Sequence, residues 1–70
     1  MEFEFDPAKS EANRRKHGID FGEAQELWAT FGIEGRLPWG PEPRWMRIGR
    51  LGGRCWSAIF TRRGNNIRLI

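Results

Sequence analysis

The chain of 70 residues contains one cysteine, Cys55, and one histidine, His17. A single cysteine excludes an internal disulfide, and one cysteine with one histidine excludes a metal site built from clustered thiolates and imidazoles. No apolar run approaches the roughly 18 residues that a membrane-spanning helix needs, and the N-terminus has no charged-then-apolar leader. The composition therefore predicts a protein of the reducing cytoplasm without a membrane span, a metal or another cofactor.

Lysine is absent from the second half of the chain, and the charges of the two halves differ in sign. Residues 1–34 contain eight acidic and four basic side chains, a net charge of −4. Residues 35–70 contain eight arginines against Glu42 alone, a net charge of +7. Because guanidinium groups make forked contacts with phosphate, this half favours a nucleic-acid partner. The alternatives are a basic surface that serves solubility and one that docks an acidic protein.

The first predicted helix covers residues 7–17. Asp6 followed by Pro7 is typical of an N-cap and a first helical position. Gly18 supplies the left-handed residue that ends a helix, and the basic residues before it lie near the negative end of the helix dipole. The result is a sharp corner that carries the only histidine of the chain.

The second predicted helix covers residues 21–30. Asp20 and Glu23 have the spacing of a capping box at its N-terminus. Apolar residues recur at three- and four-residue spacing, which predicts one face packed in the core. This predicted core face consists of Phe21, Ala24, Leu27, Trp28 and Phe31.

The remaining pattern is typical of strands and turns. Residues 2–5 alternate between polar and apolar, as in a half-buried strand. The three prolines and three glycines between Gly32 and Pro43 predict a loop without helix or regular strand. Two further strands and a third that begins near the end are separated by glycine-containing turns; these strands cover Arg44–Leu51, Arg54–Arg62 and Ile67–Ile70.

These elements predict one α+β domain over residues 1–70. Its order is an N-terminal strand, two short helices and an antiparallel three-stranded meander, with the helices on one face of the sheet. The position of the first strand in the sheet stays open. Because so small a domain buries a limited core, a partner or a homo-oligomer is a plausible source of stability.

The residue types permit general acid–base chemistry on RNA. The 2′-hydroxyl is itself the nucleophile, so the protein has to supply a base, a proton donor and cations for the phosphate. An imidazole serves as acid or base near neutral pH. The candidates are His17 with Lys9 or Lys16 for proton transfer, and Arg63, Arg68 and Arg44 for the phosphate.

Each candidate also has a structural interpretation. His17 fits a helix C-terminus, where an imidazole satisfies backbone carbonyls, and Arg63 and Arg68 fit a charged strand edge that resists aggregation. Trp39, between Pro38 and Gly40, fits a base-stacking platform or a lid over a helix, and the lid is the favoured interpretation.

Two groups of residues resemble the BrnT toxins, also called the DUF497 family. The first group opens the chain: Phe3, Phe5-Asp6-Pro7, Lys9, Asn13, Lys16-His17-Gly18-Ile19, Phe21, Glu23-Ala24 and Trp28. The second group lies in the meander: Arg44-Trp45, Ile48-Gly49, Thr61, Arg63-Gly64 and Ile67-Arg68-Leu69-Ile70. The lysine-histidine-glycine corner at its distance from the opening strand is the specific part of this similarity.

The resemblance implies a RelE-like fold and a metal-independent ribonuclease toxin of a bacterial type II toxin–antitoxin module. It implies cellular RNA as substrate, a BrnA-like antitoxin as partner, and contact with operator DNA only through that antitoxin. Carried over residue by residue, it implies a catalytic set of Lys9, Lys16, His17, Arg63 and Arg68. The arginine-rich half and its loop add predicted RNA-binding residues, which are Arg44, Arg47, Arg62 and Trp39.

The chain also departs from the family pattern. Family members usually continue past the last strand with a Ser-Ala-Arg segment and a basic C-terminal helix, whereas this chain ends at Ile70. Arg62 stands where an acidic residue often precedes Arg63. These departures predict a RelE-like domain truncated at its C-terminus. They keep open an alternative function, a non-catalytic or degraded member that binds an antitoxin or nucleic acid.

Overall fold

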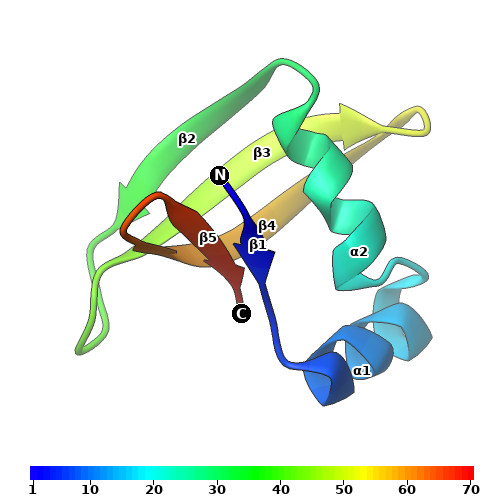
Figure 1. Ribbon diagram of the computed structural model, residues 1–70. Coiled ribbons are helices and arrows are strands. Elements are labelled where there is room, and N and C mark those ends of the chain that lie inside the picture. Colours follow the sequence, from blue (N-terminus) through cyan, green and yellow to red (C-terminus); the bar gives the residue numbers. More distant parts are fainter.

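The computed structural model describes residues 1–70 as a five-stranded mixed sheet with helices on one face (Figure 1). The strand order is β1-β5-β4-β3-β2, in which β1 is parallel to β5 and the other neighbours are antiparallel. The element bounds are β1 Phe3–Glu4, α1 Pro7–His17, α2 Phe21–Ala24, the 3₁₀ helix η1 Gln25–Trp28, β2 Gly32–Leu37, β3 Arg44–Leu51, β4 Arg54–Arg63 and β5 Asn66–Leu69.

The caps predicted for α1 are confirmed. Asp6 is the N-cap, and its carboxylate accepts a hydrogen bond of 2.8 Å from the amide of Ala8. Gly18 ends the helix in the left-handed conformation with φ of 84°, and its amide donates to the carbonyl of Arg14. Because a side chain at this φ is strained, glycine fixes the place where the chain turns after His17.

The second helix is shorter than the sequence predicted. The α-helical part ends at Ala24, and a 3₁₀ turn continues to Trp28. Phe21, Ala24 and Leu27 are buried as expected, but Phe31 lies beyond the helix and is 89% exposed, so its assignment to the core was wrong. A 3₁₀ turn has three residues per turn, which takes the apolar positions out of α-helical register after Ala24.

The capping box of α2 allows a quantitative test. A carboxylate oxygen of Asp20 accepts from the amide of Glu23 at 2.7 Å, and the amide of Asp20 donates to the side chain of Glu23 at 3.1 Å. We expect Asp20→Ala to lower the free energy of unfolding by about 1 kcal/mol. Asp20→Asn keeps an oxygen acceptor and is the matched control. Urea unfolding followed by tryptophan fluorescence measures both variants, and equal midpoints for the two would contradict the role of the cap.

The prediction of a loop from Gly32 to Pro43 is wrong in its first half. Residues Gly32–Leu37 form β2, which pairs with β3 in antiparallel register from Gly32 with Gly49 to Leu37 with Arg44. The prolines lie only in residues 38–43, which form the connection to β3. Gly32 suits a strand here because an added Cβ would lie 2.9 Å from the carbonyl oxygen of Ile48. The meander therefore has four strands and not three.

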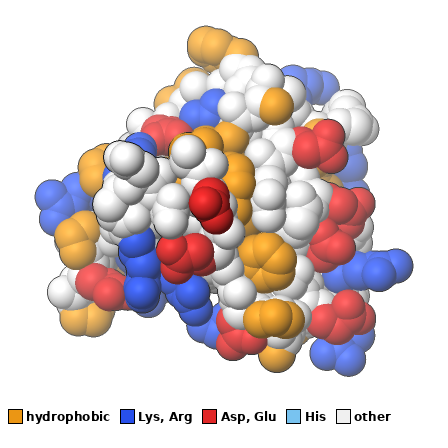
Figure 2. All heavy atoms as spheres, viewed as in Figure 1, with side chains coloured by type: hydrophobic (Ala, Val, Ile, Leu, Met, Phe, Trp, Pro, Cys, Tyr) orange, Lys and Arg blue, Asp and Glu red, His pale blue; other side chains and the backbone are white.

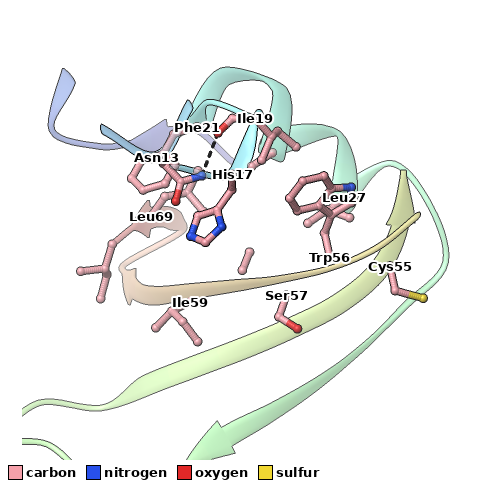
Figure 3. A pocket seen from close by; sticks show the side chains of 13 residues that line it. Asn13, His17, Ile19, Phe21, Leu27, Cys55, Trp56, Ser57, Ile59 and Leu69 are labelled. Atoms are coloured by element: carbon pink, nitrogen blue, oxygen red, sulfur yellow. Dashed lines mark hydrogen bonds between the residues drawn. The ribbon is translucent and has the colours of Figure 1, made fainter. Parts of the chain in front are cut away.

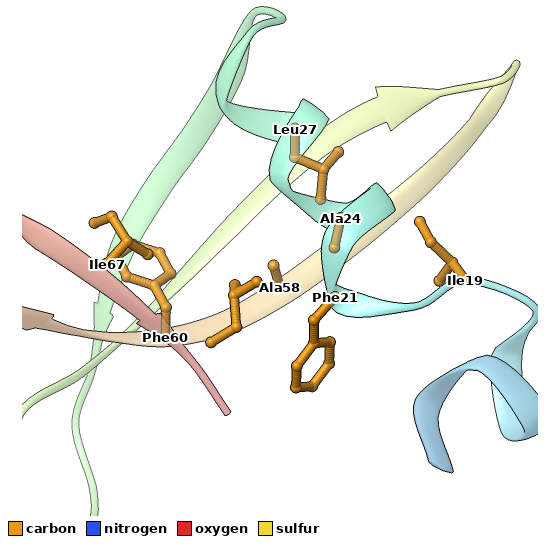
Figure 4. Close-up of a cluster of buried hydrophobic side chains, with 8 residues drawn as sticks. Ile19, Phe21, Ala24, Leu27, Ala58, Phe60 and Ile67 are labelled. Atoms are coloured by element: carbon orange, nitrogen blue, oxygen red, sulfur yellow. The ribbon is translucent and has the colours of Figure 1, made fainter. Parts of the chain in front are cut away.

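The core lies between η1 with α2 and one face of the sheet (Figure 4). Phe60 in the middle of β4 has no exposed surface, and its ring meets that of Trp28 edge to face at 5.1 Å. The parallel pairing of β1 with β5 brings Phe3 opposite Ile67 and adds it to the same core. The eight buried apolar residues are Ile19, Phe21, Ala24, Leu27, Ala58, Phe60, Ile67 and Leu69.

Candidate functional site

His17 lies at the wall of a groove between the α1–α2 corner and β4 (Figure 3). The cavity has a volume of about 380 Å³, and most of its 13 lining residues are apolar. In Figure 3 the imidazole points into the space above β4, with Asn13 beside it. No hydrogen bond of the structure involves either ring nitrogen of His17, and the residue is exposed. The interpretation of His17 as a group that satisfies backbone carbonyls is therefore wrong, since its imidazole is free for a ligand.

Two polar side chains on the same face of α1 hold the corner that carries His17. The hydroxyl of Ser10, which is buried, accepts a hydrogen bond of 2.9 Å from the amide of Phe21. The amide group of Asn13 donates to the carbonyl of Ile19 at 2.8 Å. Sequence reasoning did not assign these roles, although the spacing of residues 10, 13 and 17 places all three on one helix face. A polar stripe on an otherwise weakly patterned helix was the available signal.

The predicted arginines divide between the two faces of the sheet. Trp45, Phe60 and Leu69 lie side by side on the face that packs against the helices. Because side chains alternate along a strand, the residues next to these three point to the open face. Arg44, Thr61 and Arg68 therefore form a row on the open face, with Arg63 farther along β4.

The row on the open face contains one unsatisfied donor and one ion pair. The Nε atom of Arg44 is buried and has no hydrogen-bond partner, which is unusual for a strong donor. Thr61 beside it is buried, and Arg68 opposite Thr61 makes an ion pair of 3.7 Å with Glu4.

Arg47 and Arg62 lie on the helix-side face, where both are bound to other residues. Arg47 donates to the carbonyls of Leu27 at 2.8 Å and Thr30 at 2.9 Å, and to Glu34 at 2.8 Å. Arg62 also pairs with Glu34, at 2.6 Å, and its guanidinium lies over the ring of Trp45. The donors of Arg47 are used for structure and are not available to a phosphate.

No cavity of the structure contains both His17 and an arginine of the open-face row. Arg63 lines a separate hollow with Thr61 and Arg62. Ile59 and Ile70 are the lining residues of the His17 groove nearest to the row along the chain. Arg68 lies two residues before Ile70, about 7 Å along the strand. Arg63 lies four residues after Ile59, about 13 Å along β4. The edge of β4 separates the imidazole from the arginine row.

The other predicted residues are exposed and stand apart. Lys16 precedes His17 on α1, whereas Lys9 is two turns earlier, about 12 Å along the helix axis. Trp39 is 65% exposed in the β2–β3 connection, at the end of the sheet away from the helices, so its interpretation as a lid over a helix is wrong (Figure 1). Figure 2 shows Lys and Arg side chains at the end of the sheet that carries the β4–β5 turn, with acidic side chains beside them. Over the helices, basic and acidic side chains alternate.

Two further features bear on function. No three side chains among the histidine, the cysteine and the carboxylates lie together in a way that could hold a metal ion. None of the helices has the length and the apolar character required to cross a membrane.

Comparison with known proteins gives one family. Residues 5–70 match the model of the ribonuclease toxin BrnT of type II toxin–antitoxin systems. The chain belongs to the BrnT family. No individually curated protein matches it.

Membership in the BrnT family confirms the resemblance seen in the corner motif and the meander. It places the chain among the toxins of type II toxin–antitoxin systems, with RNA as the substrate and a protein antitoxin as the partner. The match begins just after β1 and spans α1 to β5, so both the His17 groove and the arginine row lie in the part shared with the BrnT family.

Proposed function

We propose that this chain is an endoribonuclease toxin that cleaves RNA by acid–base chemistry at His17. The observation that carries the proposal is the free imidazole in the wall of a groove, on a corner that Ser10 and Asn13 hold in place, in a chain of the BrnT family. The fold of strand, helices and antiparallel meander is, in this proposal, RelE-like.

The proposed reaction needs no group beyond the RNA and the side chains. A base takes the proton of the 2′-hydroxyl, the 2′-oxygen attacks the adjacent phosphorus, and the bond from phosphorus to the 5′-oxygen breaks. The 5′-oxygen leaves with a proton from an acid, which yields a 2′,3′-cyclic phosphate and a 5′-hydroxyl. His17 acts as the base or the acid, and Lys16 is the nearest basic side chain for the other transfer or for charge stabilisation.

The arginine row binds the RNA backbone in this proposal. Arg44, Arg63 and Arg68 hold phosphates on the open face, and the strand passes over the edge of β4 beside Ile59 and Ile70 to His17. The distance between Arg68 and Ile70 along the strand is about 7 Å, which an extended oligonucleotide can span. Trp39 and Arg62 lie at the far end of the sheet, where they contact a longer RNA.

The partners follow from the same assignment. We propose a BrnA-like antitoxin that holds the toxin inactive and provides the only contact with operator DNA. Cellular RNA as substrate places the active protein in the cytoplasm. A homo-oligomer remains an alternative source of stability for a domain of this size.

One observation favours a second function. Because no cavity joins His17 to the arginine row, the chain also fits a non-catalytic module that binds RNA or the antitoxin without cleavage. Purified protein mixed with RNA in the presence of a chelator separates the two functions. Cleavage to cyclic-phosphate ends supports the ribonuclease, and retention of intact RNA supports the binding module.

The arginine row is tested through the salt dependence of RNA binding. We expect Arg68→Ala and Arg44→Ala each to weaken binding of a single-stranded RNA and to reduce the slope of log K against log salt by about 0.7, the value for one phosphate contact. Arg36→Ala removes the same charge from β2, on the other face of the sheet, and is the control. Filter binding over a salt series gives the slopes. Equal slopes for Arg68→Ala, Arg36→Ala and the parent would show that the row does not contact RNA phosphates.

A further inference from the structure

The outer edge of β2 has no neighbouring strand. β2 ends the strand order β1-β5-β4-β3-β2, and Figure 1 shows it along the outside of the molecule with no element beyond it. Its backbone pairs only with β3, and none of the backbone hydrogen bonds outside the helices and the sheet involves residues 32–37. Neither a proline nor a bulge interrupts the strand, although both are common protections of an exposed edge. The edge is therefore open to another strand.

The register shows which residues face this edge. The amide of Ile70 donates to the carbonyl of Ile59, so odd-numbered residues of β4 direct their backbone groups to β5 and even-numbered ones to β3. The antiparallel pairs carry this alternation across β3, so that Ile33, Gly35 and Leu37 direct theirs to β3. The other residues of β2 direct their N–H and C=O groups outward; these residues are Gly32, Glu34 and Arg36.

Apolar side chains gather at the same edge. Glu34 points to the helix side of the sheet, where arginines bind its carboxylate, so Ile33 and Leu37 point to the open face. Ile33 is 66% exposed, and the aromatic residues that flank the strand, Phe31 and Trp39, are 89% and 65% exposed. Exposed apolar side chains that lie together in this way are typical of a surface that binds another protein.

The stretch 31–39 is self-complementary when two copies run antiparallel about Gly35. Ile33 of one copy then lies opposite Leu37 of the other on the open face, and Phe31 lies opposite Trp39. The two-fold axis repeats each of these contacts, as in other isologous dimers. The two copies of Gly35 form a non-hydrogen-bonded pair, in which the Cα atoms are about 4.5 Å apart.

Charge favours this register over its neighbours. With Gly35 on the axis, Glu34 of one copy exchanges main-chain bonds with Arg36 of the other, and opposite charges face each other. A shift of the axis by one residue in either direction places Glu34 opposite its own copy, or Arg36 opposite its own copy. Glu34 already binds Arg47 and Arg62, so the register has only to keep like charges apart.

We propose that two copies of this chain associate by antiparallel pairing of β2 with β2 about a two-fold axis at Gly35. The two five-stranded sheets become one continuous sheet, with the helices of both copies on one face. The contact gives partners to the outer backbone groups of β2 and covers part of the apolar side chains beside them. This pairing requires neither RNA cleavage nor an antitoxin, and β3 and β4 separate the edge from β5.

A disulfide across the axis tests the register. Gly35→Cys, made in a Cys55→Ser chain, should form a covalent dimer under mild oxidation, because two Cα atoms about 4.5 Å apart are within the range of a disulfide. Gly35 has no positive φ and has open space at its Cβ position, so the monomer accepts the side chain. Leu37→Cys in the same chain is the control, since its copy lies four residues away along the strand, about 13 Å. Non-reducing electrophoresis compares the two, and equal linking of both variants, or none in Gly35→Cys, would refute the register.

Proline at position 36 tests the main-chain bonds without a cross-link. Arg36→Pro removes an outward N–H and leaves the bonds between β2 and β3 in place, the arrangement in which an edge strand accepts proline. Because the axis repeats the change, two bonds are lost per dimer, and we expect the dissociation constant of the dimer to rise at least about tenfold. Arg36→Ala keeps the N–H and should stay closer to the parent. Sedimentation equilibrium of the purified chains over a concentration series measures all three constants.

Two surface variants test the same edge independently of how well Arg36→Pro folds. Ile33→Lys replaces an exposed side chain beside the axis and should dissociate the dimer. Ile48→Lys changes its exposed neighbour on β3, one strand away from the edge, and should leave the dimer intact. Dissociation by Ile48→Lys together with full association of Arg36→Pro would indicate stacking of the open faces and overturn the proposal. A parent chain that sediments as a monomer at every concentration would refute it as well.

Discussion

His17→Ala is expected to reduce RNA cleavage by about 10²–10⁴-fold, the usual contribution of a positioned acid or base. The imidazole lies in the groove wall, and no hydrogen bond of the protein uses it, so its removal takes away proton transfer without a structural bond. The growth inhibition caused by expression of the chain should fall with it. Cleavage of a labelled RNA in the presence of a chelator measures the effect.

Arg15→Ala is the matched control for His17→Ala, because it removes an exposed basic side chain from the same turn of α1 and does not line the groove. Both variants should keep the thermal midpoint of the parent. RNA affinity should stay near that of the parent in His17→Ala, since the phosphate contacts lie on the arginine row. Undiminished cleavage by His17→Ala would show that the imidazole takes no part in the reaction.

Arg47→Ala is expected to lower the free energy of unfolding by about 2–3 kcal/mol. Its side chain is only 14% exposed and satisfies the carbonyls of Leu27 and Thr30 at the end of η1 as well as Glu34 on β2. Loss of the guanidinium takes the donor from the carbonyls of Leu27 and Thr30, of which the Leu27 bond is partly buried, and leaves Glu34 with Arg62 alone. The expected loss is a large part of the roughly 3–5 kcal/mol that a core of this size supplies.

Arg63→Ala is the control for Arg47→Ala, because Arg63 carries the same charge but its side chain is exposed. Its removal should change the free energy of unfolding by no more than about 0.5 kcal/mol. Guanidinium chloride unfolding followed by circular dichroism gives both values. If Arg47→Ala proved as stable as Arg63→Ala, the bonds between η1 and the sheet would not hold the fold together.

The two sets of arginines explain why charge alone could not identify the RNA surface. Arg47 and Arg68 look equivalent in the sequence, since both lie in apolar strands of the basic half. Strand register separates them: Arg47 points toward η1 and Arg68 points to the open face. One residue of shift along a strand reverses the face, so the assignment depends on pairing between distant segments.

The sequence by itself determined the local structure and the family. Asp6 with Pro7, Gly18, and the Asp20–Glu23 box set the helix ends, because capping needs only neighbouring residues. Gly52-Gly53 likewise predicted the β3–β4 turn. The lysine-histidine-glycine corner carried the resemblance that the family match confirmed.

Only the tertiary structure decided which side chains remain free to act. The pairing of β2 with β3 converted a predicted loop into a strand, because backbone hydrogen bonds to a neighbour outweigh the weak strand preference of Gly32 and Gly35. The parallel pairing of β1 with β5 joined residues 3 and 67. These long-range contacts bound Arg47 to the helix end and left His17 and Arg44 without partners. Contacts between distant segments depend on packing of the whole domain, and no local pattern encodes them.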